Sequence, residues 1–156
     1  MKKDLKTPAP IQNHYNYYHP INVRYADLDT QRHVNNTAVV TFLESARMGY
    51  YQASGIWDGR SFDDFGLVVA ALKIDYLKPI LFGQTVRVGL SVIHMGNKSL
   101  RFHFEMDDGS AKSLYARGEI VMVAFDPIND RSIPIPPEWR ERINIFEKKR
   151  EENDPA

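Results

Sequence analysis

Residues 24–47 read RYADLDTQRHVNNTAVVTFLESAR, and this stretch decides the fold of the chain. A short strand is predicted over residues 21–25, a polar turn over residues 29–36, and an apolar helix from there to about Ala53. Gly55 follows and is expected to end the helix. The helix is predicted from apolar residues that recur at helical spacing, namely Val39, Phe42, Leu43, Ala46, Tyr50 and Ala53.

The turn before this helix carries two aspartates, Asp27 and Asp29. A helix N-terminus presents unpaired backbone N–H groups and the positive end of the helix dipole. Such a place can hold a carbonyl oxygen while negative charge develops on it, with a carboxylate close by. The alternative is structural, because Asp and Asn are both favoured capping residues. The residue types alone favour the capping interpretation.

The second half of the chain predicts an antiparallel sheet. Alternating apolar residues predict four strands, over residues 67–77, 85–93, 99–106 and 112–125. Short connections imply antiparallel pairing, and a single helix must then cover one face of the sheet. We therefore expect an α+β domain in which an antiparallel five-stranded sheet is wrapped around one long central helix. In the third of these strands, Leu100, Phe102, Phe104 and Met106 are predicted to face inward, and Arg101, His103 and Glu105 outward, with His103 in solvent.

Length and composition narrow the function. The chain has 156 residues, 43% of them apolar and none of them cysteine, and its formal net charge is zero. A neutral chain has no overall field that attracts nucleic acid or acidic membranes, and the missing cysteines exclude disulfides, cysteine-ligated zinc and thiol nucleophiles. The five histidines lack metal-ligand spacing, so neither a metal nor a cofactor is expected. Because no signal peptide or bilayer-length apolar run is found, we expect a cytoplasmic protein without membrane insertion.

The chain divides into three parts. Residues 1–19 are a polar N-terminal extension, in which Tyr15, Tyr17 and Tyr18 are expected to lie on the body of the protein. Residues 20–137 form the domain. Residues 138–156 are expected to form a charged C-terminal helix, over 138–149, and a tail.

Residues 27–36, DLDTQRHVNN, resemble the signature of the hotdog-fold acyl-CoA thioesterases, in the 4-hydroxybenzoyl-CoA thioesterase-like branch. Segments 69–79, 82–86, 95–99 and 131–136 resemble other parts of that family in the same order, so that the likeness covers roughly residues 20–137. Two positions depart from the family pattern. Arg32 stands where glycine is usual, which is expected to affect the turn backbone because glycine serves where φ is positive. Val39 stands where an aromatic residue is common, which is expected to reshape the acyl pocket.

The resemblance implies hydrolysis of an acyl-CoA to a free acid and CoA. It assigns Asp29 the part of general base or nucleophile, and thiolate leaves readily because a thiol has a pKa near ~8.5. It places substrate binding and the oxyanion hole in the turn, at His33, Val34, Asn35 and Asn36. It places CoA binding at Lys98, Ser99 and Arg131. It also implies a homodimer or homotetramer in which the strand over residues 67–77 pairs with its twin across a two-fold axis.

Several alternatives stay open at this point. The carrier of the acyl group is either CoA or acyl carrier protein, and the length and type of the acyl group are not determined. A non-catalytic acyl-CoA-binding module is a rival function, whereas a hydratase is disfavoured because no D-x-N-P-x-H run is present. Lys98 and Arg131 are otherwise read as solvated charges. Glu44 faces either the site or the rim of the helix.

Overall fold

The computed structural model describes residues 15–110 and 112–153. Its elements, in chain order, are β1 (Tyr17–Ile21), the 3-10 helix η1 (Tyr25–Asp27), α1 (Asn36–Ser54), β2 (Leu67–Tyr76), β3 (Val86–Met95), β4 (Ser99–Asp107), β5 (Leu114–Asp126), β6 (Arg131–Ser132) and α2 (Pro137–Asn153). Within these described ranges, no helix is both long and apolar enough to cross a membrane.

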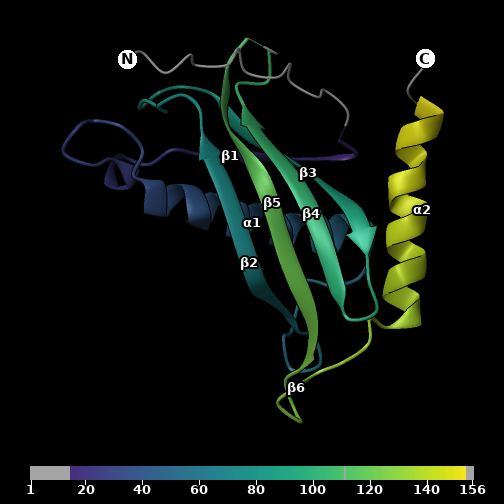
Figure 1. The fold of residues 1–156 in the computed structure, drawn as a ribbon. Coiled ribbons are helices and arrows are strands. Elements are labelled where there is room, and N and C mark those ends of the chain that lie inside the picture. The colour runs from purple at the N-terminus through teal and green to yellow at the C-terminus, as the bar shows by residue number, and fades with distance from the viewer. Residues whose placement is uncertain (1–14, 111, 154–156) are drawn as a thin grey trace, which may run out of the picture.

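The five long strands form one antiparallel sheet in the order β1-β3-β4-β5-β2. The two-residue strand β6, which was not predicted, pairs with the end of β5. Figure 1 shows α1 crossing one face of this sheet and α2 standing beside β3, on the side away from β2. The predicted α+β architecture, with antiparallel strands and one long helix against them, is therefore confirmed.

The helix α1 is bounded as its sequence predicts. The Asn35 side chain caps its start by accepting a hydrogen bond from the Thr37 backbone N–H at 2.9 Å, and Gly55 ends it at a φ of 79°. Five of the six predicted apolar positions are buried. The sixth, Ala53, is exposed, and Tyr51 and Ser54 take its place on the buried face of the last turns.

The first strand lies earlier in the chain than residues 21–25, so that prediction was wrong. Residues Tyr17–Ile21 pair with β3, and the Tyr17 ring packs edge-on against Tyr50 of α1 at a centroid distance of 6.1 Å. Residues Tyr25–Asp27 instead form a 3-10 turn, closed by hydrogen bonds between Arg24 and Asp27. The expected domain boundary at residue 20 falls inside β1.

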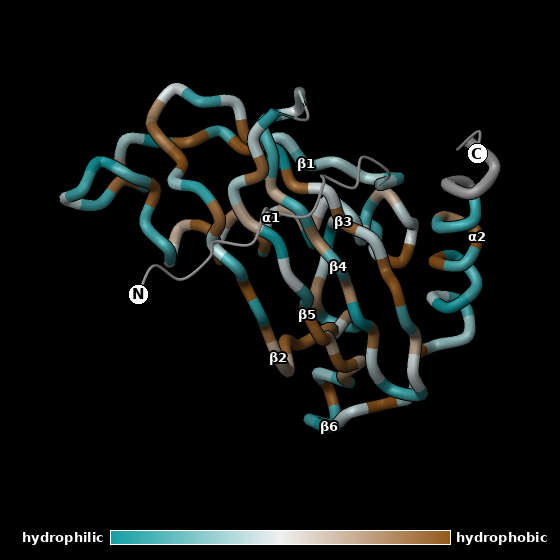
Figure 2. Tube along the Cα trace, turned by 45° about the horizontal axis from the view of Figure 1, so that its top comes forward, coloured by the Kyte–Doolittle hydropathy of each residue, from teal (hydrophilic) through white to brown (hydrophobic). Residues whose placement is uncertain are grey.

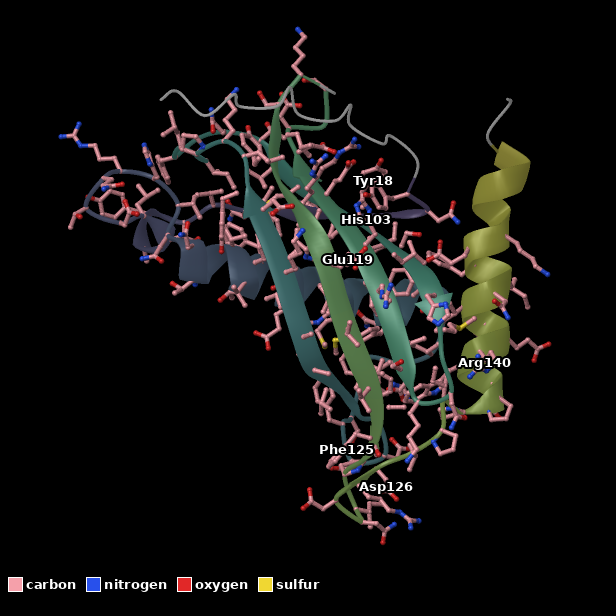
Figure 3. The ribbon with its side chains drawn as sticks, viewed as in Figure 1. Tyr18, His103, Glu119, Phe125, Asp126 and Arg140 are labelled. Carbon is pink, nitrogen blue, oxygen red and sulfur yellow. The ribbon has the colours of Figure 1, made fainter. Side chains whose placement is uncertain are left out.

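The outer face of β4 is covered rather than open to solvent. The inward residues are completely buried, as predicted, but Glu105 on the outer face is buried as well, at 2% exposure. His103 is half-buried, and its Nδ1 lies 2.8 Å from the Tyr15 hydroxyl. Figure 3 shows Tyr18 close to His103 on this face. The prediction that His103 lies in solvent was wrong, because the segment that begins at Tyr15 lies across this face. That segment lies on the body of the protein, as expected.

The two edges of the sheet differ. The β2 edge is open in a single chain, and Val68 and Val69 are 43% and 46% exposed. Figure 2 shows this apolar strand at the margin of the sheet. Near the other edge, α2 is held against β3 by Glu147, whose Oε1 accepts hydrogen bonds from the Val92 backbone N–H at 2.8 Å and the Tyr50 hydroxyl at 2.5 Å.

Candidate functional site

Asp27 and Asp29 have different surroundings, although both precede α1. Asp27 is buried, and its two carboxylate oxygens accept hydrogen bonds from Arg24, one from the guanidinium at 2.7 Å and one from the backbone N–H at 2.8 Å. The hydrogen bond from the Arg24 side chain is the main reason why the pKa of Asp27 lies below its ordinary value. Asp27 therefore has the structural capping role, at η1 rather than at α1.

Asp29 belongs to a tight turn of its own. Its Oδ1 accepts hydrogen bonds from the backbone N–H groups of Gln31, at 2.8 Å, and His33, at 3.3 Å. The turn is closed by the Asp29 N–H, which donates to the His33 carbonyl at 2.8 Å. Among the described residues, Oδ2 has no hydrogen-bond donor. One oxygen therefore fixes the carboxylate and the other stays available for chemistry.

Arg32 holds the left-handed part of this turn, with a φ of 62°. A residue with a Cβ pays a steric cost in that region, whereas glycine does not. Glycine is usual at position 32 in the family, and we expected this position to need a positive φ. The structure supports that expectation. The backbone nevertheless adopts this φ with arginine in place.

A pocket of about 380 Å³ opens beside Asp29. Residues 29–39 supply one wall, and residues 76–80 and 115–116, from the ends of β2 and β5, supply the other. The predicted residues His33, Val34, Asn35 and Asn36 all line it. The fold thus brings Asp29 together with the whole predicted substrate-binding turn.

The backbone N–H groups of that turn are not equally available. Val34 N–H donates to the Ile80 carbonyl at 2.8 Å, and Asn35 N–H donates to the Asp27 carbonyl at 2.8 Å. Both are therefore occupied by the bonds that build the turn. Asn36, the first residue of α1, has no backbone acceptor within the described ranges and keeps one of the unpaired N–H groups of a helix start.

The pocket also contains residues that sequence reasoning missed. Gln31, Tyr76, Lys78 and Tyr115 line it. The Tyr76 hydroxyl donates to the Asn36 carbonyl at 3.3 Å, which ties the end of β2 to the start of α1. Tyr76 and Lys78 stand just before Pro79 at the end of a strand, which was only a weak signal in the sequence. No local pattern marks Tyr115, which comes from a distant strand.

Lys98, Ser99 and Arg131 do not lie with Asp29 in one chain. The pocket is near Ala116, whereas Ser99 pairs with Val123 further along β5. Seven residues of strand separate these positions, which is roughly 23 Å. Lys98 and β6 meet there, since the Lys98 Nζ donates to the Ser132 Oγ at 3.2 Å. Figure 3 shows Asp126, which pairs with Arg131, at this far end of β5.

Comparison with known proteins agrees with this fold. A family model described as the thioesterase-like superfamily matches residues 23–143. A thioesterase from Thermus thermophilus, whose crystal structure holds coenzyme A and Zn, is 32% identical with a TM-score of 0.74, over 87% of this chain and 98% of that one. The PA5185 protein of Pseudomonas aeruginosa strain PAO1 is 27% identical with a TM-score of 0.79, over 90% and 97% of the two chains. The long-chain acyl-CoA thioesterase FadM of Escherichia coli K12 is 24% identical over 128 residues, which are 82% of this chain and 97% of FadM.

The antiparallel sheet around one long helix is the hotdog fold, and the family model gives the class as thioesterase-like. The chain belongs to the thioesterase-like superfamily. The predicted family and hotdog fold are confirmed, and the family supports hydrolysis of a thioester as the class of reaction.

Proposed function

We propose that this protein hydrolyses an acyl-CoA to a free carboxylic acid and CoA, with Asp29 as the catalytic carboxylate. The observation that carries the proposal is the position of Asp29, which lies in the pocket with Oδ1 held by two backbone N–H groups. A carboxylate fixed by one oxygen can use the other to activate water or to attack the thioester carbonyl. The thiolate leaves without a strong general acid.

The start of α1 supplies the counterpart to this carboxylate. The Asn36 backbone N–H lies at the positive end of the helix dipole, and Asn36 lines the same pocket as Asp29. Negative charge that develops on the thioester oxygen is stabilised by such a donor. We therefore assign the oxyanion contact to Asn36 and give Val34 and Asn35 the part of positioning residues, because their N–H groups shape the turn.

The acyl group enters the apolar part of the pocket. Val34, Val39 and Ile80 are buried there, beside Ala116. With valine at position 39 the pocket keeps space that an aromatic residue would fill. FadM acts on long-chain acyl-CoA, and an aliphatic acyl group is the substrate that this wall fits best.

A second copy of the chain completes the site. If β2 pairs with its twin antiparallel across a two-fold axis, the Leu67 end of one strand lies beside the Tyr76 end of the other. The Leu67 end pairs with Ala124 and is next to Lys98, whereas the Tyr76 end borders the pocket. The pocket then faces Lys98, Ser99 and Arg131 of the partner subunit. This arrangement supports the proposed CoA-binding role of three residues that lie far from Asp29 in one chain.

A thiol-release assay over a panel of acyl-CoA esters of increasing length tests the proposed function. The protein has no cysteine and adds no thiol background. We expect turnover of at least one ester, and slower turnover of the same acyl group on a short thiol that lacks the nucleotide. Faster turnover of the acyl group on acyl carrier protein would identify the other carrier. Tight binding of a non-hydrolysable acyl-CoA analogue without any turnover would replace the proposal with the binding-module function.

A further inference from the structure

Arg47 of α1 is a buried cation that the chain leaves incompletely paired. Its side chain is 6% exposed, and its Nε has no hydrogen-bond partner in the described part of the chain. Its ion-pair partner is Glu44, one helical turn away, with 3.9 Å between Nη2 and Oε1, which is long for an ion pair. Removing a guanidinium from water is costly unless acceptors satisfy its donors. The buried Tyr51 hydroxyl is a neighbour of this guanidinium, but Arg47 Nε stays without an acceptor. An acceptor from outside the single chain would supply one.

Arg47 lies on the side of α1 that faces the open β2 edge. The opposite side of the helix meets β1, where Tyr17 lies directly over Gly49. On the β2 side, Tyr76 bonds to Asn36 at the start of the helix, and Tyr51 packs against Phe65, just before β2, at a centroid distance of 5.4 Å. The Asn36 end of α1 therefore lies near the Tyr76 end of β2, and its Tyr51 end lies near the Leu67 end.

The position of the charges suits a two-fold axis. Glu44 and Arg47 lie near the middle of α1. Each end of α1 lies near one end of β2, so the middle of the helix lies near the middle of the strand. An axis through the middle of β2 therefore passes close to residues 44–47. On that flank Val40 is 38% exposed and the Glu44 side chain is 66% exposed, so both are open to a partner. A two-fold axis that places Arg47 of one subunit against Glu44 of the other also places Glu44 of the first against Arg47 of the second. Unlike charges are then joined twice.

We infer that Arg47 of each subunit forms an ion pair with Glu44 of the partner subunit, in a reciprocal clasp between the two α1 helices below the paired β2 strands. The occupant of this helix face is a second copy of the chain, since the face carries one cation and one carboxylate and is complementary to itself. The clasp also sets the register of β2 against its twin, because only one register brings both charge pairs together. The inference depends on the two-fold assembly of the proposed function and not on the hydrolytic reaction.

Complementary charge variants test the clasp by light scattering at low micromolar protein concentration. Glu44→Arg leaves two cations on each flank and Arg47→Glu leaves two carboxylates, so each variant alone places like charges across the axis. We expect each to lose the dimer mass of the parent. Mixed in equal amounts, they should recover that mass as a hybrid dimer, because the cations of one then meet the carboxylates of the other. Recovery should weaken as salt is raised.

The matched control is Glu119→Arg, the same charge change at an exposed residue in the middle of β5. Figure 3 shows Glu119 over the front of the sheet, whereas α1 lies behind it. It should keep the parent mass. Circular dichroism checks that each variant is folded. If Arg47→Glu does not fold alone, coexpression of the two variants with different tags should still yield the hybrid dimer.

Four results would overturn the inference, each in a different way. A dimeric Glu44→Arg with parental stability would show that the flank is not in the interface. Folded variants that give no hybrid dimer would show that these two positions do not face each other. A third result combines two measurements: the charge variants keep the parent mass, and Arg47→Met loses activity only on acyl groups with a distal carboxylate. Arg47 would then bind the ligand and not the partner subunit. A monomeric parent would instead contradict the β2 pairing itself.

Discussion

Asp27 and Asp29 are two residues apart and have opposite environments: Arg24 binds both oxygens of Asp27, whereas Asp29 lines the pocket with one oxygen held and the other open. The first carboxylate is structural, and the second is the one that we propose as catalytic. Substitutions at the two positions should therefore separate stability from catalysis.

Asp29→Asn is expected to abolish most of the activity and leave the fold intact. The amide oxygen of asparagine can still accept from the Gln31 and His33 N–H groups, so the turn survives. Its lost basicity should lower kcat by ~10²–10⁴-fold. Thiol release measures the loss, while the melting temperature and the binding of a non-hydrolysable analogue should stay near the parent's. Near-parental turnover would contradict the assigned role.

Asp27→Asn is expected to have the opposite effect, since it weakens the bonds to Arg24. We expect the melting temperature to fall by roughly 2–4 °C, with a much smaller change in kcat than for Asp29→Asn. A variant with parental stability and strongly reduced kcat would reverse the assignment of the two aspartates.

The stabilising effect of Asp27 should depend on pH in one direction. Its pKa is lowered in the folded chain, so its contribution is complete above the unfolded value of about 3.9 and is lost as pH falls through the lower folded value. The difference in melting temperature between parent and Asp27→Asn should therefore be constant near neutral pH and shrink below about pH 4. Thermal scans at matched ionic strength measure it, and a difference that grows on acidification would be the wrong sign.

Lys98→Ala and Arg131→Ala are expected to raise KM for full CoA esters with little change in kcat, because both positions lie far from the reacting carbonyl. The effect should vanish for a short thioester without the nucleotide. Arg101→Ala, which removes an exposed arginine of β4, is the control. Equal KM values for all three variants and the parent would remove these residues from the CoA site.

Val69→Lys is expected to dissociate the dimer, because a charge on an open strand edge opposes pairing with another strand. Ile93→Lys is the matched control, since Ile93 is a similarly exposed branched residue at 49% but lies on β3, away from the β2 edge. Sedimentation velocity distinguishes the two. Equal dimer masses would place the interface elsewhere.

Arg32→Gly should be neutral or slightly stabilising, whereas Arg32→Val should destabilise by about 1 kcal/mol or more. The φ of 62° suits glycine and is unfavourable for a branched residue. Denaturant unfolding of both variants measures the difference. A Val variant as stable as the Gly variant would mean that the turn rearranges around the side chain.

The sequence by itself determined the elements whose signals are local. The apolar spacing of α1, the Asn35 cap, the Gly55 stop and the alternation of Leu100, Phe102, Phe104 and Met106 each act within one element. They are readable because side-chain periodicity and backbone preference depend on neighbours a few residues away. The resemblance in residues 27–36 added the family.

Only the tertiary structure decided between residues that look alike in the sequence. Asp27 and Asp29 are both aspartates before a helix, and Asp29 lines a pocket because residues 76–80 and 115–116 form its other wall. Glu105 is buried because the N-terminal aromatic segment crosses β4, and Arg47 is buried because α1 packs under the sheet. Each outcome depends on contacts between parts of the chain far apart in sequence, which no local pattern encodes.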